Sequence, residues 1–130
     1  MATAIDTNVL VRFLIDDGSD QVATARAVFD SNRISIPSSV MLECEWVLRS
    51  AFRIPATAIC DAFARLLNME TVTVSDMEIV ARAVDAHRAG VDFADALHVF
   101  SSTGCDRFVT FDTALRRRGG IVDTIKLTEP

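Results

Sequence analysis

The chain contains few of the residues that mark disulfide-rich or zinc-binding proteins. Its 130 residues include only three cysteines, at Cys44, Cys60 and Cys105, and no Cys-x-x-Cys pair. Three widely spaced thiols provide neither a disulfide framework nor a zinc knuckle. We therefore expect reduced cysteines of the kind found in the core of a cytoplasmic protein.

Long apolar runs and linkers are also absent. The longest stretch without Asp, Glu, Lys or Arg is ten residues, Ala96–Cys105, about half of what a membrane-spanning helix needs. The first residues carry Asp6 where a signal peptide would be apolar. No repeat, low-complexity tract or Pro/Gly-rich linker divides the chain. These features predict a single domain over residues 1–130, located in the cytoplasm and away from the membrane.

Positive charge is scarce and unevenly distributed between its two residue types. Twelve arginines stand against one lysine, Lys126, and the net charge is −5. Proteins that coat nucleic acid are usually basic, because neutralising phosphates dominates that binding. A nuclease is not excluded, because a catalytic metal site is itself built from carboxylates. Arginine also suits bidentate contacts with phosphate, although it is common in surface ion pairs as well.

Short β-type segments alternate with longer helical ones along the chain. Strands are predicted near residues 3–5, 33–36, 71–74, 107–110 and 121–127. Helices are predicted near residues 9–14, 20–29, 38–52, 55–67, 78–88 and 93–102, with a short one ending at 116–118. Ser75 and Glu78 have the spacing of a capping box at the start of the fifth helix. Strands separated by helices predict an α/β fold with a parallel sheet.

Aspartates stand at the ends of predicted strands and at the starts of predicted helices. Asp6 follows the first strand and Asp112 follows a later one, whereas Asp92 and Asp95 open a helix three residues apart. Ligands of open parallel sheets bind beyond the carboxyl ends of the strands, so Asp6 and Asp112 are expected to face such a site. Asp is also a favoured helix N-cap, and capping alone explains Asp6, Asp92 or Asp112 taken singly. Asp95 lies within an apolar helix and needs a partner, a proton or a metal ion.

Two glutamates share one helix, and the pattern around them suggests different roles. Glu43 shares a helical face with Val40, Trp46 and Val47 and is predicted to be a buried acid of the site, although pairing with an arginine is an alternative. Glu45 lies four residues before Arg49 and is predicted to form an ordinary surface ion pair.

Several acids at one edge of a sheet repel one another unless a cation holds them. All-oxygen ligation favours Mg²⁺ or Mn²⁺. The chain lacks His-Glu-x-x-His, Gly-x-Gly-x-x-Gly and Walker sequences. The residues therefore point to a magnesium- or manganese-dependent site.

Four short motifs, in order along the chain, resemble those of the PIN-domain family. They are IDTNVL at Ile5–Leu10, ECEWVL at Glu43–Leu48, DFADAL at Asp92–Leu97 and TFD at Thr110–Asp112. The likeness covers essentially the whole chain and is greatest to the VapC-type toxins of toxin–antitoxin pairs.

This resemblance implies a three-layer α/β/α sandwich with a central, mostly parallel sheet. It also implies a Mg²⁺- or Mn²⁺-dependent endoribonuclease that hydrolyses RNA with metal-activated water. The acids of the family fall on four residues that would be catalytic and metal-binding, namely Asp6, Glu43, Asp95 and Asp112. The supporting positions fall on Thr7, Asn8, Asp92 and Thr110.

The resemblance further implies three kinds of partner, namely an RNA substrate, a cognate VapB-like antitoxin and a second copy of the chain in a homodimer. The main alternative is a catalytically inactive PIN-like module for protein interaction. An aspartyl-phosphate enzyme fits less well, because Asn8 stands where a dehalogenase has its second Asp and Lys126 is the only lysine.

Overall fold

A computed structural model describes residues 1–119 and 125–130. The chain forms two compact units, Met1–Met77 and Glu78–Pro130, and each is described by itself. Within the described residues, no helix has the length and apolar character needed to cross a membrane.

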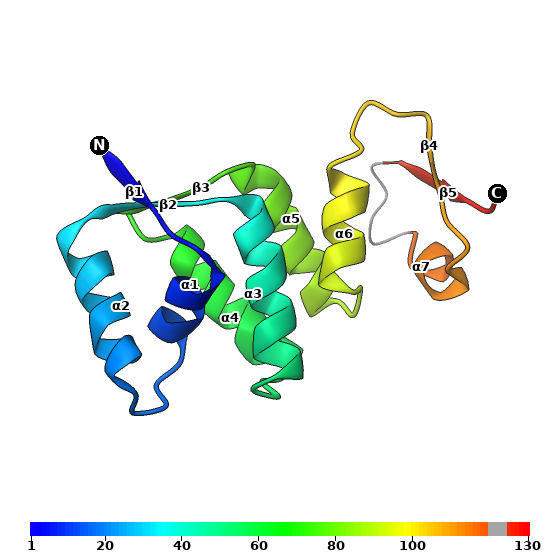
Figure 1. Cartoon of the computed structure of the whole chain (residues 1–130). Coiled ribbons are helices and arrows are strands. Elements are labelled where there is room, and N and C mark those ends of the chain that lie inside the picture. The colour runs from blue at the N-terminus through cyan, green and yellow to red at the C-terminus, as the bar shows by residue number, and fades with distance from the viewer. Residues whose placement is uncertain (120–124) are drawn as a thin grey trace. The chain divides into compact units, whose positions relative to one another are not determined.

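The first unit alternates strands and helices as the sequence predicts (Figure 1). Its elements in chain order are β1 (Ala2–Ala4), α1 (Thr7–Leu14), α2 (Asp20–Ser31), β2 (Arg33–Ile36), α3 (Ser38–Ser50), α4 (Ala56–Leu67) and β3 (Val72–Val74). Pro37 and Pro55 immediately precede α3 and α4, which fits the rigid φ that proline brings to a helix start.

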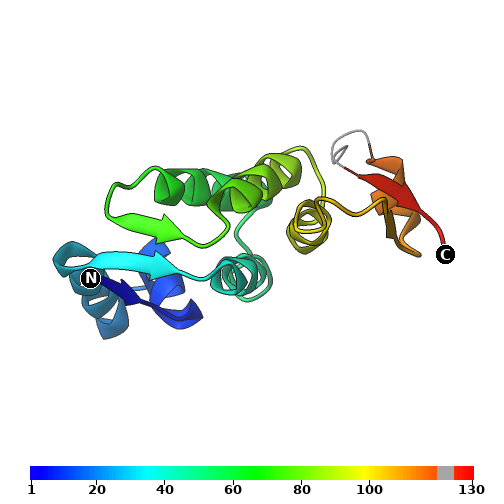
Figure 2. The same ribbon diagram turned by 90° about the horizontal axis from the view of Figure 1, so that it is seen from above.

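The three strands of this unit form a parallel sheet in the order β1-β2-β3. Thr3 pairs with Ile34, and Ile34 pairs with Val72. Figure 2 shows the three arrows side by side and pointing the same way. The carboxyl ends of the strands therefore meet at one edge of the sheet, where the chain continues into Asp6, Pro37 and Ser75.

Helix α1 packs against both α2 and α3 within the first unit. Phe13 of α1 stacks on Phe29 of α2 with ring centroids 3.6 Å apart. Leu10 of α1 and Ile36 of β2 are fully buried. This packing fixes the direction of α1, and hence of the residues at its start.

The second unit contains α5 (Met77–Arg88, from Glu78 onward), α6 (Phe93–Phe100), β4 (Arg107–Val109), α7 (Thr113–Arg117) and β5 (Lys126–Thr128). Strands β4 and β5 pair in parallel, with Phe108 opposite Leu127. The predicted α/β class with parallel strands is thus confirmed. The predicted last strand began at Ile121, but residues 121–124 lie outside the described residues, and β5 begins at Lys126.

The capping box predicted at Ser75 and Glu78 is wrong. The Ser75 hydroxyl instead accepts a hydrogen bond of 2.7 Å from the backbone N–H of Ser38, 37 residues earlier. Helix α3 has no side-chain cap of its own, because Pro37 stands where a Ser, Asp or Asn would be. The end of β3 therefore caps the helix that follows β2, and the Ser75 N–H donates to the Ile36 carbonyl beside it.

We expect Ser75→Ala to lower the free energy of unfolding by about 1 kcal/mol, because it leaves an N–H in the first turn of α3 unpaired. Ser39→Ala removes an exposed hydroxyl from the same turn and should change it by less than about 0.5 kcal/mol. Urea unfolding of both variants tests this. Equal stabilities would show that the contact between the two serines contributes nothing.

Candidate functional site

Asp6 stands between β1 and α1 and acts as the N-cap of that helix. One of its carboxylate oxygens, Oδ1, accepts a hydrogen bond of 3.1 Å from the Val9 N–H. The side chain is exposed. Capping therefore occupies one oxygen of Asp6 and fixes the orientation of the carboxylate, while the described residues give Oδ2 no hydrogen-bond partner.

Asp92 and Asp112 are N-caps of the same kind in the second unit. Asp92 Oδ2 accepts from the Asp95 N–H at 3.1 Å, and Asp112 Oδ1 accepts from the Leu115 N–H at 3.1 Å. Thr110 contributes to the second cap, because its hydroxyl accepts from the Asp112 N–H at 3.0 Å. The capping interpretation is thus correct for Asp6, Asp92 and Asp112, and it leaves each of them an oxygen for another ligand.

Asp92, Asp95 and Asp112 line one pocket of the second unit. The pocket has a volume of about 190 Å³, and its other lining residues are Gly90, Val91, Ala114, Leu115 and Arg118. Three of the lining residues thus carry carboxylates, and Arg118 is the only cation among the residues that line the pocket. The helix starts of α6 and α7 bring these acids together.

The electrostatics of this pocket are clearest at Asp95. Partial burial raises the pKa of the Asp95 carboxyl, and the nearby charges of Asp92 and Asp112 raise it further, whereas His98 acts in the opposite direction. A carboxyl group under these influences resists ionisation. A divalent cation would reverse that preference by favouring the charged form.

The burial of the two glutamates of α3 is the reverse of the prediction. Glu43 is exposed, whereas Glu45 is only 1% exposed and receives a hydrogen bond of 2.8 Å from Arg49 Nε. The buried face of α3 consists of Met41, Cys44, Glu45 and Leu48.

The error came from Trp46, which the sequence pattern treats as a core residue and which is 58% exposed. The spacing of Met41, Cys44 and Leu48 places Glu45 on their face and could have revealed its burial. The ion pair with Arg49 was predicted correctly, but it is not a surface pair. An exposed Glu43 is open to a ligand from solvent, so its assignment to the site remains a prediction.

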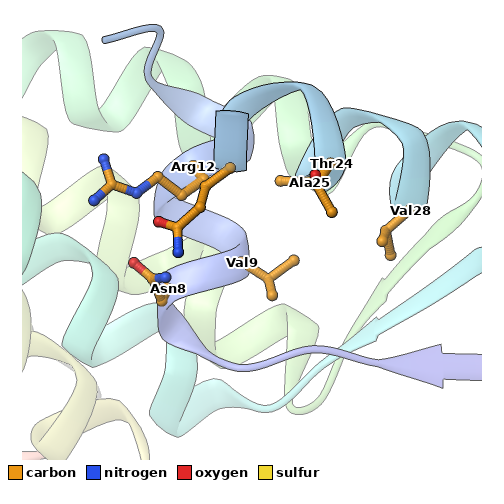
Figure 3. A pocket seen from close by; sticks show the side chains of 7 residues that line it. Asn8, Val9, Arg12, Thr24, Ala25 and Val28 are labelled. Atoms are coloured by element: carbon orange, nitrogen blue, oxygen red, sulfur yellow. The ribbon is translucent and has the colours of Figure 1, made fainter. Parts of the chain in front are cut away.

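A second hollow lies between α1 and α2, beside the helix that Asp6 caps (Figure 3). Its volume is about 190 Å³, and its lining residues are Asn8, Val9, Arg12, Gln21, Thr24, Ala25 and Val28. Arg12 is already engaged there, through an ion pair with Asp17 and the ring of Phe52, 5.9 Å from its Cζ. Asn8 thus faces this hollow, and no hydrogen bond joins it to Asp6 among the described residues.

The donor chemistry of these acids fits a hard divalent cation, since carboxylate oxygens are the ligands that Mg²⁺ and Mn²⁺ prefer. The crowded charge at Asp95 fits as well. Within residues 1–119 and 125–130, no three Asp, Glu, His or Cys side chains are already grouped closely enough to hold a metal ion.

Each unit thus has parallel strands and carboxylates at helix starts, Asp6 in the first unit and Asp92 and Asp112 in the second. The chain belongs to the PIN-domain family, because the family model for the PIN domain matches residues 3–121. The match extends through both units. PIN domains have a nuclease-type fold, are generally metal-dependent and commonly occur in toxin–antitoxin systems. A search of curated proteins found no match.

We expect Asp95→Asn to stabilise the metal-free protein at neutral pH. The folded-state pKa of Asp95 is raised above its ordinary value of 3.8, so ionisation costs stability as pH rises above about 4. Asn keeps the shape and removes the charge. The side chain is partly exposed, so the gain should stay below about 1 kcal/mol, or a few degrees in Tm.

Melting curves in EDTA at pH 3.5, 5 and 7 test this expectation. The variant and the wild type should melt alike at pH 3.5 and diverge as the pH rises. A difference in Tm that does not depend on pH would mean that the charge of Asp95 is not the cause.

Proposed function

We propose that this protein is a Mg²⁺- or Mn²⁺-dependent endoribonuclease whose carboxylates are Asp6, Glu43, Asp95 and Asp112. The single domain predicted over residues 1–130 is part of this proposal. The observation that carries it is the pocket of the second unit, which three carboxylates line and where partial burial and the charges of Asp92 and Asp112 raise the pKa of Asp95. Acids that only cap helices have no reason to line the same pocket, because like charges repel.

The geometry of the caps supports a ligand role for the aspartates. Each capping aspartate uses one oxygen for a backbone N–H, which holds the carboxylate in one rotamer at little further entropic cost. The other oxygen is then presented in a fixed direction. Preorganised ligands of this kind are what a site needs to orient a water molecule and a phosphate group.

Each residue has a distinct role in this proposal. Asp95 and Asp112 supply negative charge from the pocket, Asp6 supplies an exposed carboxylate before α1, and Glu43 supplies one from α3. Asp92 adds charge beside Asp95, and Thr110 fixes the backbone at Asp112. Thr7 and Asn8 are supporting residues at the start of α1. When bound, the cation would lower the pKa of a water molecule and stabilise the charge that develops on the phosphate.

The same proposal gives the protein its cellular role. As the toxin of a toxin–antitoxin pair, it would act in the cytoplasm on RNA, as a homodimer that a VapB-like antitoxin neutralises.

We expect expression of the chain alone to arrest growth and Asp6→Asn to remove the arrest. Normal growth with abundant folded wild-type protein would contradict the toxin role.

Cleavage by matched glutamine variants tests the site directly. Glu43→Gln removes an exposed carboxylate and should reduce RNA cleavage at least 100-fold with little loss of stability, as expected for a group that stabilises the transition state. Glu45→Gln weakens a buried pair with Arg49 and should cost about 1–2 kcal/mol of stability while cleavage per folded molecule stays near wild type.

Both variants are assayed on one RNA with Mg²⁺ and with Mn²⁺, and circular dichroism verifies the fold. Asp30→Asn, an exposed aspartate in α2, is the control for a lost negative charge. An inactive Glu45→Gln beside an active Glu43→Gln would reverse the assignment. Full activity in both, or no cleavage by the wild type, would favour the inactive interaction module.

Metal binding should also stabilise the folded protein. At 100 times its dissociation constant, Mn²⁺ should raise the free energy of unfolding by about 2.7 kcal/mol, and Asp95→Asn should lose most of this gain. Differential scanning calorimetry from micromolar to millimolar Mn²⁺ measures it. A transition that does not move with Mn²⁺ would show that the acids are helix caps and not ligands.

A further inference from the structure

Arg118 joins two parts of the second unit that each carry an acid of the pocket. It is the C-cap of α7, the five-residue helix whose N-cap is Asp112. From there its Nη1 donates a hydrogen bond of 3.1 Å to the carbonyl of Ala89, 29 residues earlier. Ala89 follows the end of α5, where unpaired carbonyls carry partial negative charge. A guanidinium is therefore a strong partner at this position.

Gly90 shapes the place where the guanidinium lies. A Cβ atom at residue 90 would stand 2.7 Å from Arg118 Nη1, 3.2 Å from Cζ and 3.4 Å from Nη2. The guanidinium thus rests on the bare backbone of Gly90, which also has a positive φ of 105°. Any side chain at residue 90 would displace Arg118 as well as strain the turn.

The contact has a direct geometric consequence for the acids. Asp92, the N-cap of α6, lies two residues after Gly90. Asp112 and Arg118 flank the same short helix, so the position of one determines that of the other. Fixing Arg118 on residues 89–90 therefore holds Asp112 beside Asp92 and Asp95 in the pocket that all four residues line.

We propose that Arg118 is a positioning residue that clamps α7 to the turn between α5 and α6 and so keeps Asp112 near Asp92 and Asp95. This inference rests on the proposed function, because a metal-binding nuclease needs these carboxylates held near one another against their repulsion. Arg118 has no ion pair with an aspartate among the described residues. Its contacts are to backbone, as expected of a clamp.

A residue that only neutralises charge would behave differently from a clamp. The two roles predict opposite effects of Arg118→Gln on the repulsion among the acids and on cation binding. If Arg118 only neutralised the pocket, then Arg118→Gln would increase the repulsion among the acids and would attract cations more strongly. If Arg118 is a clamp, then Arg118→Gln lets Asp112 move away. Repulsion at Asp95 then falls, and a cation loses a ligand held in place.

The first test is a double-mutant cycle on the metal-free protein at pH 7. The clamp predicts that the rise in Tm caused by Asp95→Asn is smaller in the Arg118→Gln background than in the wild type, because Asp112 is one of the two aspartates whose charge acts on Asp95. Arg117→Gln is the matched control, because it removes the same charge from the adjacent, exposed residue and should leave the rise unchanged. An equal or larger rise in the Arg118→Gln background would overturn the clamp, and so would the absence of any rise in the wild type.

The second test is Mn²⁺ binding measured by calorimetry. Arg118→Gln should bind Mn²⁺ about tenfold more weakly, the usual cost of losing a residue that orients a ligand. Arg117→Gln should stay within about twofold of the wild type. Arg118→Lys should recover part of the loss, because lysine can donate to the Ala89 carbonyl but lacks the flat guanidinium. Unchanged or tighter binding by Arg118→Gln would overturn the proposal.

These tests separate the clamp from the proposed function. If the wild type neither binds Mn²⁺ nor cleaves RNA, the nuclease proposal fails, while the metal-free cycle still decides whether Arg118 holds the acids together. If Arg118→Gln does not fold, Arg118→Lys replaces it in the same cycle, with a smaller reduction of the rise expected. A Lys variant that leaves the rise unchanged would then overturn the clamp.

Discussion

Repulsion between carboxylates is the constraint on which the second unit is built. Asp92, Asp95 and Asp112 line a single pocket, where partial burial raises the pKa of Asp95 and the charges of Asp92 and Asp112 raise it further. The unit offsets this repulsion with backbone N–H groups at two helix starts and with the contact between Arg118 and Ala89. Helix capping thus has a second use here, since it presents charge in a fixed direction.

In the first unit, too, side chains at helix starts fix the positions of the acids. Its parallel strands end at one edge, and the next segments begin there with an aspartate that caps α1, a proline and a serine. Ser75 caps a helix that lies elsewhere in the sequence. The edge of the sheet is therefore held together by side chains that also set the helix directions. Asp6 and Glu43 owe their positions to this edge and to the packing of α1 against α3.

Much of this architecture could be predicted from the sequence, because local patterns determine it. The strand Arg33–Ile36 and the start of α3 after Pro37 were predicted where they occur, and the predicted start of α4 at Pro55 is one residue early. The aspartate caps were also identified, since a helix start is a local feature. Boundaries at β1 and β3 differ by one residue.

Features that depend on distant residues were missed for a physical reason. The bond from Ser38 to Ser75 spans 37 residues and the contact of Arg118 with Ala89 spans 29, so no local pattern encodes either. The two glutamates of α3 were exchanged because tryptophan normally marks the buried face of a helix, whereas Trp46 is exposed here.

Because Asp6, Asp92 and Asp112 are helix N-caps, the protein can change at these positions in a particular way. Asparagine caps a helix about as well as aspartate, and the two differ by one atom and one charge. At each of these positions a single substitution can therefore discharge the carboxylate while the helix start survives. If the chain is a toxin, cells under selection to escape it have short mutational paths to a folded, harmless protein. Such a protein still displays the same surface to any partner that recognises its shape.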